Sequence, residues 1–138
     1  MVRPVLLIED DEDDAALALE AAHRAGVSRE MVVKRDGEEA LAYLAGLSTD
    51  ALPELILLDL MLPKLHGLQV LERLRAEPRS RVIPVVIFTS SKQPEDVRRA
   101  YQLCANGYVV KPVDFNDFEA AVAQLVAYWL ARNVGPFV

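Results

Sequence analysis

Side chains that could carry out phosphoryl chemistry follow four short apolar segments of the chain. They are Glu9 and Asp10 after residues 4–8, Asp59 after 55–58, Thr89 after 85–88, and Lys111 after 108–110. A carboxylate beside a divalent cation, an amine and a hydroxyl supplies a nucleophile, charge neutralisation and a donor to the transferred oxygens. If these side chains meet, they are the groups needed to accept a phosphoryl group.

Alternating apolar and amphipathic segments predict the elements that would position these groups. Five apolar segments span residues 4–8, 31–33, 55–58, 85–88 and 108–110. Because they are apolar at successive positions, we expect parallel strands covered on both faces. Helices are expected from Asp11 to Gly26, from near Asp36 to Gly46, from about Leu65 to Glu77, from Pro94, and from Asp114. The sequence therefore predicts an α/β sandwich of five βα units.

The order of the strands in the sheet decides whether the chemical groups meet. In open α/β sheets, ligands bind beyond the carboxyl ends of the strands. With the order 2-1-3-4-5, the ends of strands 1, 3, 4 and 5 are neighbours, and strand 2, which ends in Lys34 and Arg35, lies at an edge. Two like charges 4 Å apart repel by ~4 kcal/mol at an effective dielectric of 20, so three carboxylates there require a cation. Oxygen ligands favour Mg²⁺.

Length and charge limit the classes of protein that fit. The chain has 138 residues and a formal net charge of −6, which indicates one domain over residues 1–138 and argues against binding to nucleic acid or an anionic membrane. One cysteine, Cys104, excludes an internal disulfide. The apolar stretch near the amino terminus is short for a signal peptide, and no stretch approaches the ~18 residues of a membrane span. We expect a cytoplasmic protein.

In order and spacing, these residues resemble the receiver domain of two-component response regulators. The matching positions are Glu9-Asp10, Asp59 with Pro63 four residues on, Thr89-Ser90, Tyr108 and Lys111-Pro112. The resemblance covers essentially the whole chain. It implies the flavodoxin-like (βα)5 fold with sheet order 2-1-3-4-5, and a last helix from about residue 114 that continues into a short tail.

The resemblance also implies a role for each matching residue. Asp59 would be the phosphoacceptor, and Mg²⁺ would be bound by Glu9, Asp10, Asp59 and the backbone carbonyl of Met61. Thr89 and Lys111 would contact the phosphoryl group, and Tyr108 would move with Thr89 to change the surface formed by helix 4, strand 5 and helix 5. Lys111-Pro112 would be a cis peptide. Such a protein catalyses only its own phosphorylation and slow dephosphorylation, so it would not be an enzyme.

A narrower likeness concerns the partner. The chain resembles single-domain regulators that pair with phytochrome-type histidine kinases, such as bacteriophytochromes. This likeness rests on Thr89-Ser90-Ser91, on residues 111–115, and on the last helix with Tyr128-Trp129-Leu130. Two positions depart from the usual receiver pattern: His66 stands where Asp is usual, and Cys104 stands where Gly is common.

Two other classes of protein remain open. A phosphatase of the haloacid-dehalogenase type also uses an Asp nucleophile, a hydroxyl and a lysine. Such an enzyme would have a second Asp two residues after the nucleophile, and here that position is Met61. An adaptor that keeps the fold without phosphorylation is the other alternative. The six glycines are too widely spaced for a nucleotide-binding glycine motif.

The last helix has a composition that favours a protein interface. Residues 120–131 carry no charge, although a helix packed on one face of a sheet normally has charges on the opposite face. One stripe of this helix is expected to face the sheet, and we predict a two-fold homodimer through the helix and the neighbouring sheet edge. The interface residues are predicted to be Phe118, Val122, Leu125, Tyr128, Trp129 and Leu130.

Three remaining residues are expected to have no chemical role. His23 and His66 are far apart in sequence and lack metal-ligand spacing, so both are predicted to be surface histidines. Cys104 follows Val97 and Tyr101 at helical spacing, which predicts a small buried apolar side chain.

Overall fold

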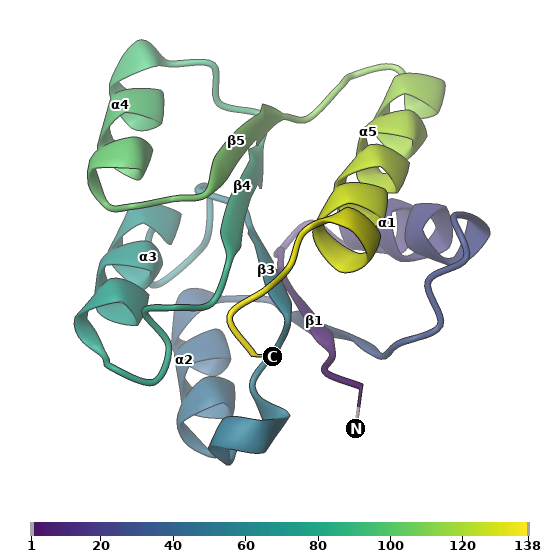
Figure 1. Ribbon diagram of the computed structural model, residues 1–138. Coiled ribbons are helices and arrows are strands. Elements are labelled where there is room, and N and C mark those ends of the chain that lie inside the picture. The colour runs from purple at the N-terminus through teal and green to yellow at the C-terminus, as the bar shows by residue number, and fades with distance from the viewer. Residues whose placement is uncertain (1, 138) are drawn as a thin grey trace.

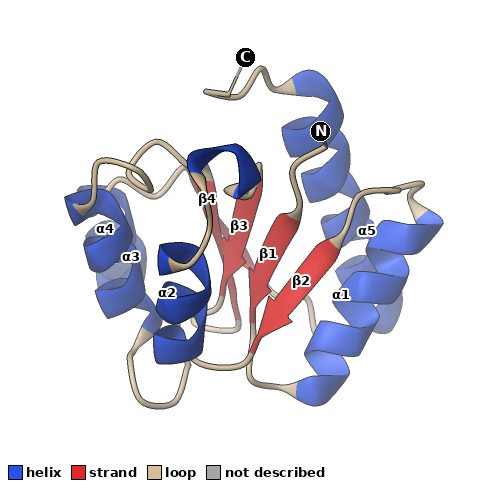
Figure 2. Cartoon of the chain, turned by 90° about the horizontal axis from the view of Figure 1, so that it is seen from below, coloured by secondary structure: helices blue, strands red, loops and turns tan. Residues whose placement is uncertain are grey.

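Five parallel strands form one sheet in the order β2-β1-β3-β4-β5. Figure 1 labels four of them, and Figure 2 labels β2 next to β1. The structure is a computed structural model that describes residues 2–137. The strands are β1 (Val5–Ile8), β2 (Met31–Lys34), β3 (Leu55–Leu58), β4 (Val85–Thr89) and β5 (Gly107–Val110). The helices are α1 (Glu12–Arg24), α2 (Gly37–Ala45), α3 (Gly67–Ala76), α4 (Pro94–Gln102) and α5 (Phe115–Ala127). A 3₁₀ turn, η1 (Thr49–Ala51), precedes β3, and a π-helical turn, η2 (Tyr128–Arg132), extends α5. The predicted fold and strand order are confirmed.

Helices cover both faces of the sheet (Figure 2). Leu6, Ile8, Ile56 and Leu58 share one core with α2, α3 and α4, while Val5, Leu7, Leu55 and Leu57 share another core with α1 and α5. Because successive side chains of a strand point to opposite faces, strands that supply both cores must be apolar at every position. All four residues of β1 and of β3 are buried, as the sequence pattern predicted.

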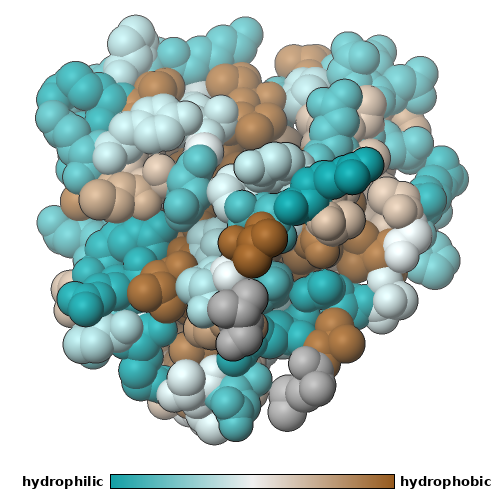
Figure 3. All heavy atoms as spheres, viewed as in Figure 1, coloured by the Kyte–Doolittle hydropathy of each residue, from teal (hydrophilic) through white to brown (hydrophobic). Residues whose placement is uncertain are grey.

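The two outer strands differ from this prediction. Every residue of β2 and of β5 is only half-buried, because each strand lies at an edge of the sheet. The β5 edge runs between α4 and α5 (Figure 1). Seen from the same side, hydrophobic side chains are visible in the space between those two helices (Figure 3).

Acidic caps fix where three of the helices begin. The carboxylates of Asp11, Asp36 and Asp114 each accept a hydrogen bond from the backbone N–H three residues on, at the start of α1, α2 and α5. Such caps accept hydrogen bonds from backbone N–H groups that have no partner within the helix. Their negative charge also interacts favourably with the positive end of the helix dipole. The helices therefore start within about a residue of the sequence-based expectation.

The start of α3 lies two residues beyond the predicted Leu65. Lys64 adopts a left-handed conformation (φ 66°), and His66 caps the helix by accepting the N–H of Leu68 on Nδ1 at 3.1 Å. The first helical residue, Gly67, lies so close to the end of β3 that a Cβ there would overlap the backbone of Asp59 and Leu60. Glycine is required at this close approach, which holds α3 against the loop that follows Asp59.

Candidate functional site

Lys111 lies at the centre of a cluster of carboxylates at the carboxyl end of the sheet. Its Nζ is 2.6 Å from Oε1 of Glu9, 2.8 Å from Oδ2 of Asp59 and 2.8 Å from Oδ2 of Asp14. The side chains of Lys111, Glu9 and Asp59 are each at most 7 % exposed. An ammonium has three N–H donors, and here each of them has a carboxylate partner.

The sheet itself brings these side chains together. Glu9 directly follows β1, Asp59 follows β3, and Lys111 follows β5. The N–H of Asp59 donates to the carbonyl of Ile8 (3.1 Å), and the N–H of Lys111 donates to the carbonyl of Thr89 (2.7 Å). Parallel pairing thus continues one residue past the strands and holds the functional residues in register, so the predicted meeting of the strand ends is found.

Three of the acids also form a group suited to a cation. One carboxylate oxygen from each of Glu9, Asp10 and Asp59 lies within 4.8 Å of the others. Asp10 is exposed, whereas Glu9 and Asp59 are buried, so the group has one side open to solvent. An all-oxygen donor set with a solvent-facing side fits Mg²⁺ or a similar hard divalent ion, which keeps several waters when bound.

Burial and charge shift the pKa values of the acids in opposite directions. Burial raises the pKa of Glu9 from 4.5 to about 7, because the opposing effect of Lys111 is smaller and the charge of Asp59 adds to the rise. Burial also acts to raise the pKa of Asp59, but bonds from Lys111, the Met61 N–H and the Thr89 hydroxyl outweigh it and lower the value below 3.8. Asp59 is therefore ionised at neutral pH, as a nucleophile must be.

The lysine is held in its charged form. Burial acts to lower the pKa of Lys111, but the hydrogen bonds to Asp14, Asp59 and Glu9 outweigh it and raise the pKa above its ordinary 10.5. A fixed positive charge next to Asp59 suits the stabilisation of negative charge on an incoming phosphoryl group.

A hydroxyl and an aromatic side chain connect this cluster to α4. Thr89, at the end of β4, is fully buried, and its hydroxyl contributes to lowering the pKa of Asp59. The hydroxyl of Tyr108 donates to the carbonyl of Ser91 at 3.0 Å. Ser91 in turn donates through its own hydroxyl to Asp96 at 2.6 Å. The loop after β4 is thus bound both to β5 and to the first turn of α4.

Asp14 is a site residue that the sequence did not reveal. In the sequence it is one of four consecutive acids at residues 11–14, a pattern that the positive end of a helix dipole already explains. The cap formed by Asp11 sets the first turn of α1 so that Asp14, and not its neighbour Asp13, reaches Lys111. Only the three-dimensional position of the first turn of α1, which brings Asp14 within 2.8 Å of the Lys111 ammonium, distinguishes these two acids.

The predicted cis peptide is wrong. All peptide bonds of the described residues are trans, including Lys111–Pro112. The lysine does not need an isomerised bond to point inward, since its backbone is paired to Thr89 and its ammonium is bound by three carboxylates. Trans is also the lower-energy isomer before proline, by ≈ 0.5–1 kcal/mol.

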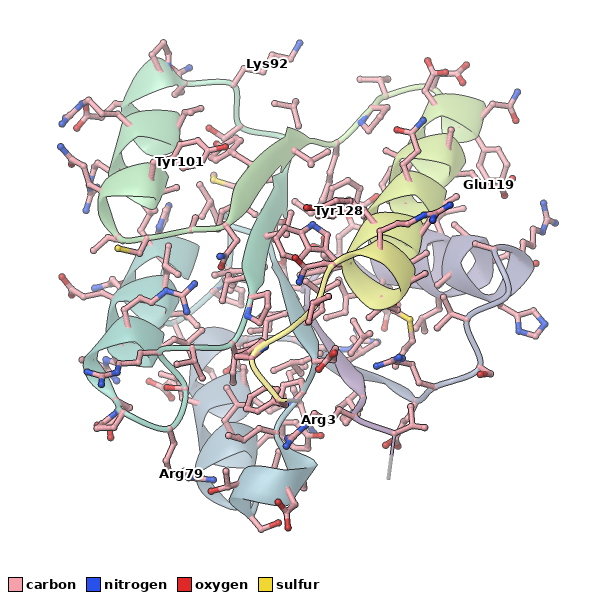
Figure 4. All side chains as sticks on the ribbon, in the orientation of Figure 1. Arg3, Arg79, Lys92, Tyr101, Glu119 and Tyr128 are labelled. Atoms are coloured by element: carbon pink, nitrogen blue, oxygen red, sulfur yellow. The ribbon has the colours of Figure 1, made fainter. Side chains whose placement is uncertain are left out.

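Half of the predicted interface residues lie inside the protein. Phe118, Val122 and Leu125 are at most 9 % exposed and pack in the core beneath α5, so they cannot contact a partner. Trp129 and Leu130 are partly buried against the same core, whereas Tyr128 is 52 % exposed. Figure 4 labels Tyr128 at the end of α5 and Tyr101 on α4, on either side of β5.

The two residues that depart from the receiver pattern have structural explanations. His66 is the cap of α3 described above. Cys104 is exposed, so the prediction of a buried side chain is wrong. Helix α4 ends at Gln102, and helical spacing no longer applies at Cys104, which has a φ of 65°. This left-handed conformation, which favours glycine, turns the chain toward β5.

Comparisons with known proteins agree with this geometry. Residues 5–123 match the family model described as response regulator receiver domain. FilR2 of Methanothrix harundinacea, a probable methanogenesis regulatory protein, is 40 % identical over 137 residues, covering 96 % of this chain and 86 % of its own length. Response regulator Rcp1 of Synechocystis sp. is 35 % identical over 129 residues, covering 91 % of this chain and 88 % of its own.

Solved structures extend the comparison to the fold. The structure of the phosphorylated cyanobacterial phytochrome response regulator RcpA has a TM-score of 0.92 at 34 % identity, covering 99 % of both chains. The Mn²⁺-bound form of Rcp1 has a TM-score of 0.89 at 34 % identity, covering 96 % of this chain and 98 % of that one. Within residues 2–137, none of the helices is long and apolar enough to cross a membrane.

Proposed function

The chain belongs to the response regulator receiver domains of two-component signalling, and on this basis we propose that Asp59 accepts a phosphoryl group from a phosphohistidine of a partner histidine kinase. The observation that carries the proposal is the buried carboxylate of Asp59, whose Oδ2 lies 2.8 Å from the buried ammonium of Lys111. The similarity of the chain to RcpA and Rcp1 supports the proposal that the partner is a histidine kinase of the phytochrome type, such as a bacteriophytochrome.

In the proposed reaction, a phosphoryl group passes from the imidazole of the kinase histidine to the carboxylate of Asp59. An oxygen of Asp59 forms a bond to phosphorus while the bond from phosphorus to the imidazole nitrogen breaks, and the electron pair of that bond stays on the imidazole. Lys111 stabilises the negative charge on the phosphoryl oxygens, and the Thr89 hydroxyl can donate to one of them. Glu9, Asp10 and Asp59 would hold Mg²⁺, which when bound supplies further charge neutralisation. By the resemblance to receiver domains, the backbone carbonyl of Met61 would be a fourth ligand.

The phosphorylated side chain acts as a signal through the groups that surround it. A phosphoryl group adds negative charge and acceptor oxygens, which attract Thr89. Because the loop after Thr89 is bound to Tyr108 through Ser91, a shift of that loop would change the surface of α4, β5 and α5. We expect a readout on this surface and no turnover of a separate substrate, which distinguishes the protein from a phosphatase.

We also propose that two copies of the chain pair through the α4–β5–α5 face. The half-buried β5 edge and the exposed rings of Tyr101 and Tyr128 support this surface. Sizing chromatography with light scattering, before and after treatment with beryllofluoride, measures the assembly. A dimer that Tyr128→Glu dissociates is expected, and an unchanged dimer in that variant would place the interface elsewhere.

Phosphorylation itself is tested with acetyl phosphate and Mg²⁺, which need no partner kinase. Wild-type protein should acquire one acid-labile phosphoryl group, and Asp59→Asn should acquire none. An adaptor without phosphorylation would show no incorporation in either protein. Rapid multiple turnover of p-nitrophenyl phosphate would instead identify a phosphatase.

A further inference from the structure

Asp14 differs from the other partners of Lys111 because it lies outside the proposed metal-binding group. Of the three carboxylates that contact the ammonium, those of Glu9 and Asp59 also belong to the group that could hold a cation. The carboxylate of Asp14 contacts the ammonium at 2.8 Å and does not belong to that group.

A divalent ion and the ammonium would compete for the same oxygens. Lys111 contacts Oε1 of Glu9 and Oδ2 of Asp59. The other oxygens of these two acids accept backbone N–H groups, from Asp11 (3.2 Å) and from Met61 (3.1 Å). An ion bound to Glu9 and Asp59 must therefore share oxygens that are already in use. It would also repel the nearby ammonium, which then needs an anion that the ion does not occupy.

Asp14 is placed to be that anion. Its backbone is fixed in the first turn of α1, where its N–H donates to the Asp11 cap at 3.0 Å. The backbone of Lys111 is fixed by its bond to Thr89. The flexible lysine side chain can thus move toward α1 while both backbones stay in place.

We propose that Asp14 is a positioning residue that retains the ammonium of Lys111 when a divalent ion occupies Glu9, Asp10 and Asp59, and that it thereby raises the affinity for the ion. The inference rests on the proposed metal site and concerns only binding, not phosphorylation.

Asp13 offers a matched control for the charge of Asp14. It lies in the same turn of α1, is exposed, and is not among the carboxylates that contact Lys111 in the described structure. Titration of the full chain with Mg²⁺ by calorimetry compares Asp14→Asn with Asp13→Asn. We expect the first to weaken binding by about tenfold, within the usual range of coupling between two sites. The second should weaken binding by less than about threefold, because exposed charges are screened.

A double-mutant cycle tests whether Asp14 acts through the lysine. In a Lys111→Met background, Asp14→Asn should weaken Mg²⁺ binding no more than Asp13→Asn does, and Asp14→Glu in the otherwise wild-type chain should restore most of the affinity. Thermal unfolding in EDTA establishes that each variant is folded. Equal effects of the two Asn variants, or an undiminished effect of Asp14→Asn without the lysine, would overturn the inference while leaving the metal site intact. Wild-type protein that binds no Mg²⁺ would overturn both.

Discussion

The ammonium of Lys111 lies 2.6 Å from the carboxylate of Glu9, although the strands that precede these residues are separated in the sheet by β3 and β4. The lysine side chain crosses above the ends of both intervening strands and contacts Asp59 on the way. The ammonium at the end of β5 thus contacts residues that directly follow two other strands, β1 and β3, and one residue of α1. We therefore expect this end of the sheet to contribute to the stability of the fold and to be the place where a cation binds.

Removal of the central cation should destabilise the fold. Lys111→Met leaves Glu9, Asp14 and Asp59 without their shared partner, and loss of one member of a buried ion pair typically costs 3–5 kcal/mol. We expect the free energy of unfolding in urea to fall by about 3 kcal/mol, and Mg²⁺ to recover more stability in this variant than in the wild type. Lys92→Met is the control, because Lys92 extends into solvent (Figure 4). Equal stability of the two variants would show that the cluster contributes nothing to the fold.

The raised pKa of Glu9 predicts how stability depends on pH without metal. Because its pKa is about 7 in the folded protein and near 4.5 when unfolded, the folded state binds more protons between these values, and stability falls as pH rises through them. The lowered pKa of Asp59 acts below pH 4, and the raised pKa of Lys111 acts above pH 10, so neither opposes this trend.

Urea unfolding in EDTA between pH 5 and pH 8 measures this dependence. The wild type should lose stability across the range, and Glu9→Gln should show a flatter profile because it has no carboxyl group to titrate. A wild-type profile that does not fall between pH 5 and pH 8 would contradict the raised pKa and would mean that Lys111 keeps Glu9 ionised across this range.

The Tyr108 hydroxyl should restrain the loop after β4. Tyr108→Phe removes the hydrogen bond to the Ser91 carbonyl, which leaves the ring in place and costs about 1 kcal/mol. Hydrogen exchange should accelerate at residues 90–93 and remain unchanged at β1. Tyr101→Phe, which alters an exposed ring on α4, is the matched control. Unchanged exchange in the loop would contradict the link between Tyr108 and α4.

The histidine at position 66 should act as a helix cap. His66→Ala removes the acceptor for the Leu68 N–H and should lower the free energy of unfolding by about 1 kcal/mol, whereas His66→Asn keeps an acceptor and should retain stability. His23→Ala, at an exposed histidine in α1, should change little. If His66→Ala and His23→Ala have the same free energy of unfolding, the cap does not stabilise the fold.

The strand ends were predictable because their positions follow from local patterns. An apolar segment covered on both faces ends at its first charged residue, and parallel strands bring those residues to one edge, so Glu9, Asp59 and Lys111 could be grouped from sequence. Asp14 could not, because its neighbours carry the same charge and only the rotation of α1 selects it. The burial of Cys104 could not be predicted from helical spacing, because α4 ends at Gln102 and the spacing does not extend to an exposed residue beyond it. One stripe of α5 packs against the sheet, as its apolar spacing predicts, but its residues Phe118, Val122 and Leu125 are too buried to form the predicted interface.

The most direct test of the central claim is to locate the phosphoryl group. Protein treated with acetyl phosphate and Mg²⁺ is reduced with borohydride, which converts an acyl phosphate to an alcohol, and the modified residue is identified by peptide mass spectrometry. We predict a single modification at Asp59 that is absent without Mg²⁺. Modification at Glu9, at Asp10 or at Asp14 with Asp59 unmodified, or no modification at all, would contradict the proposal that Asp59 is the phosphoacceptor.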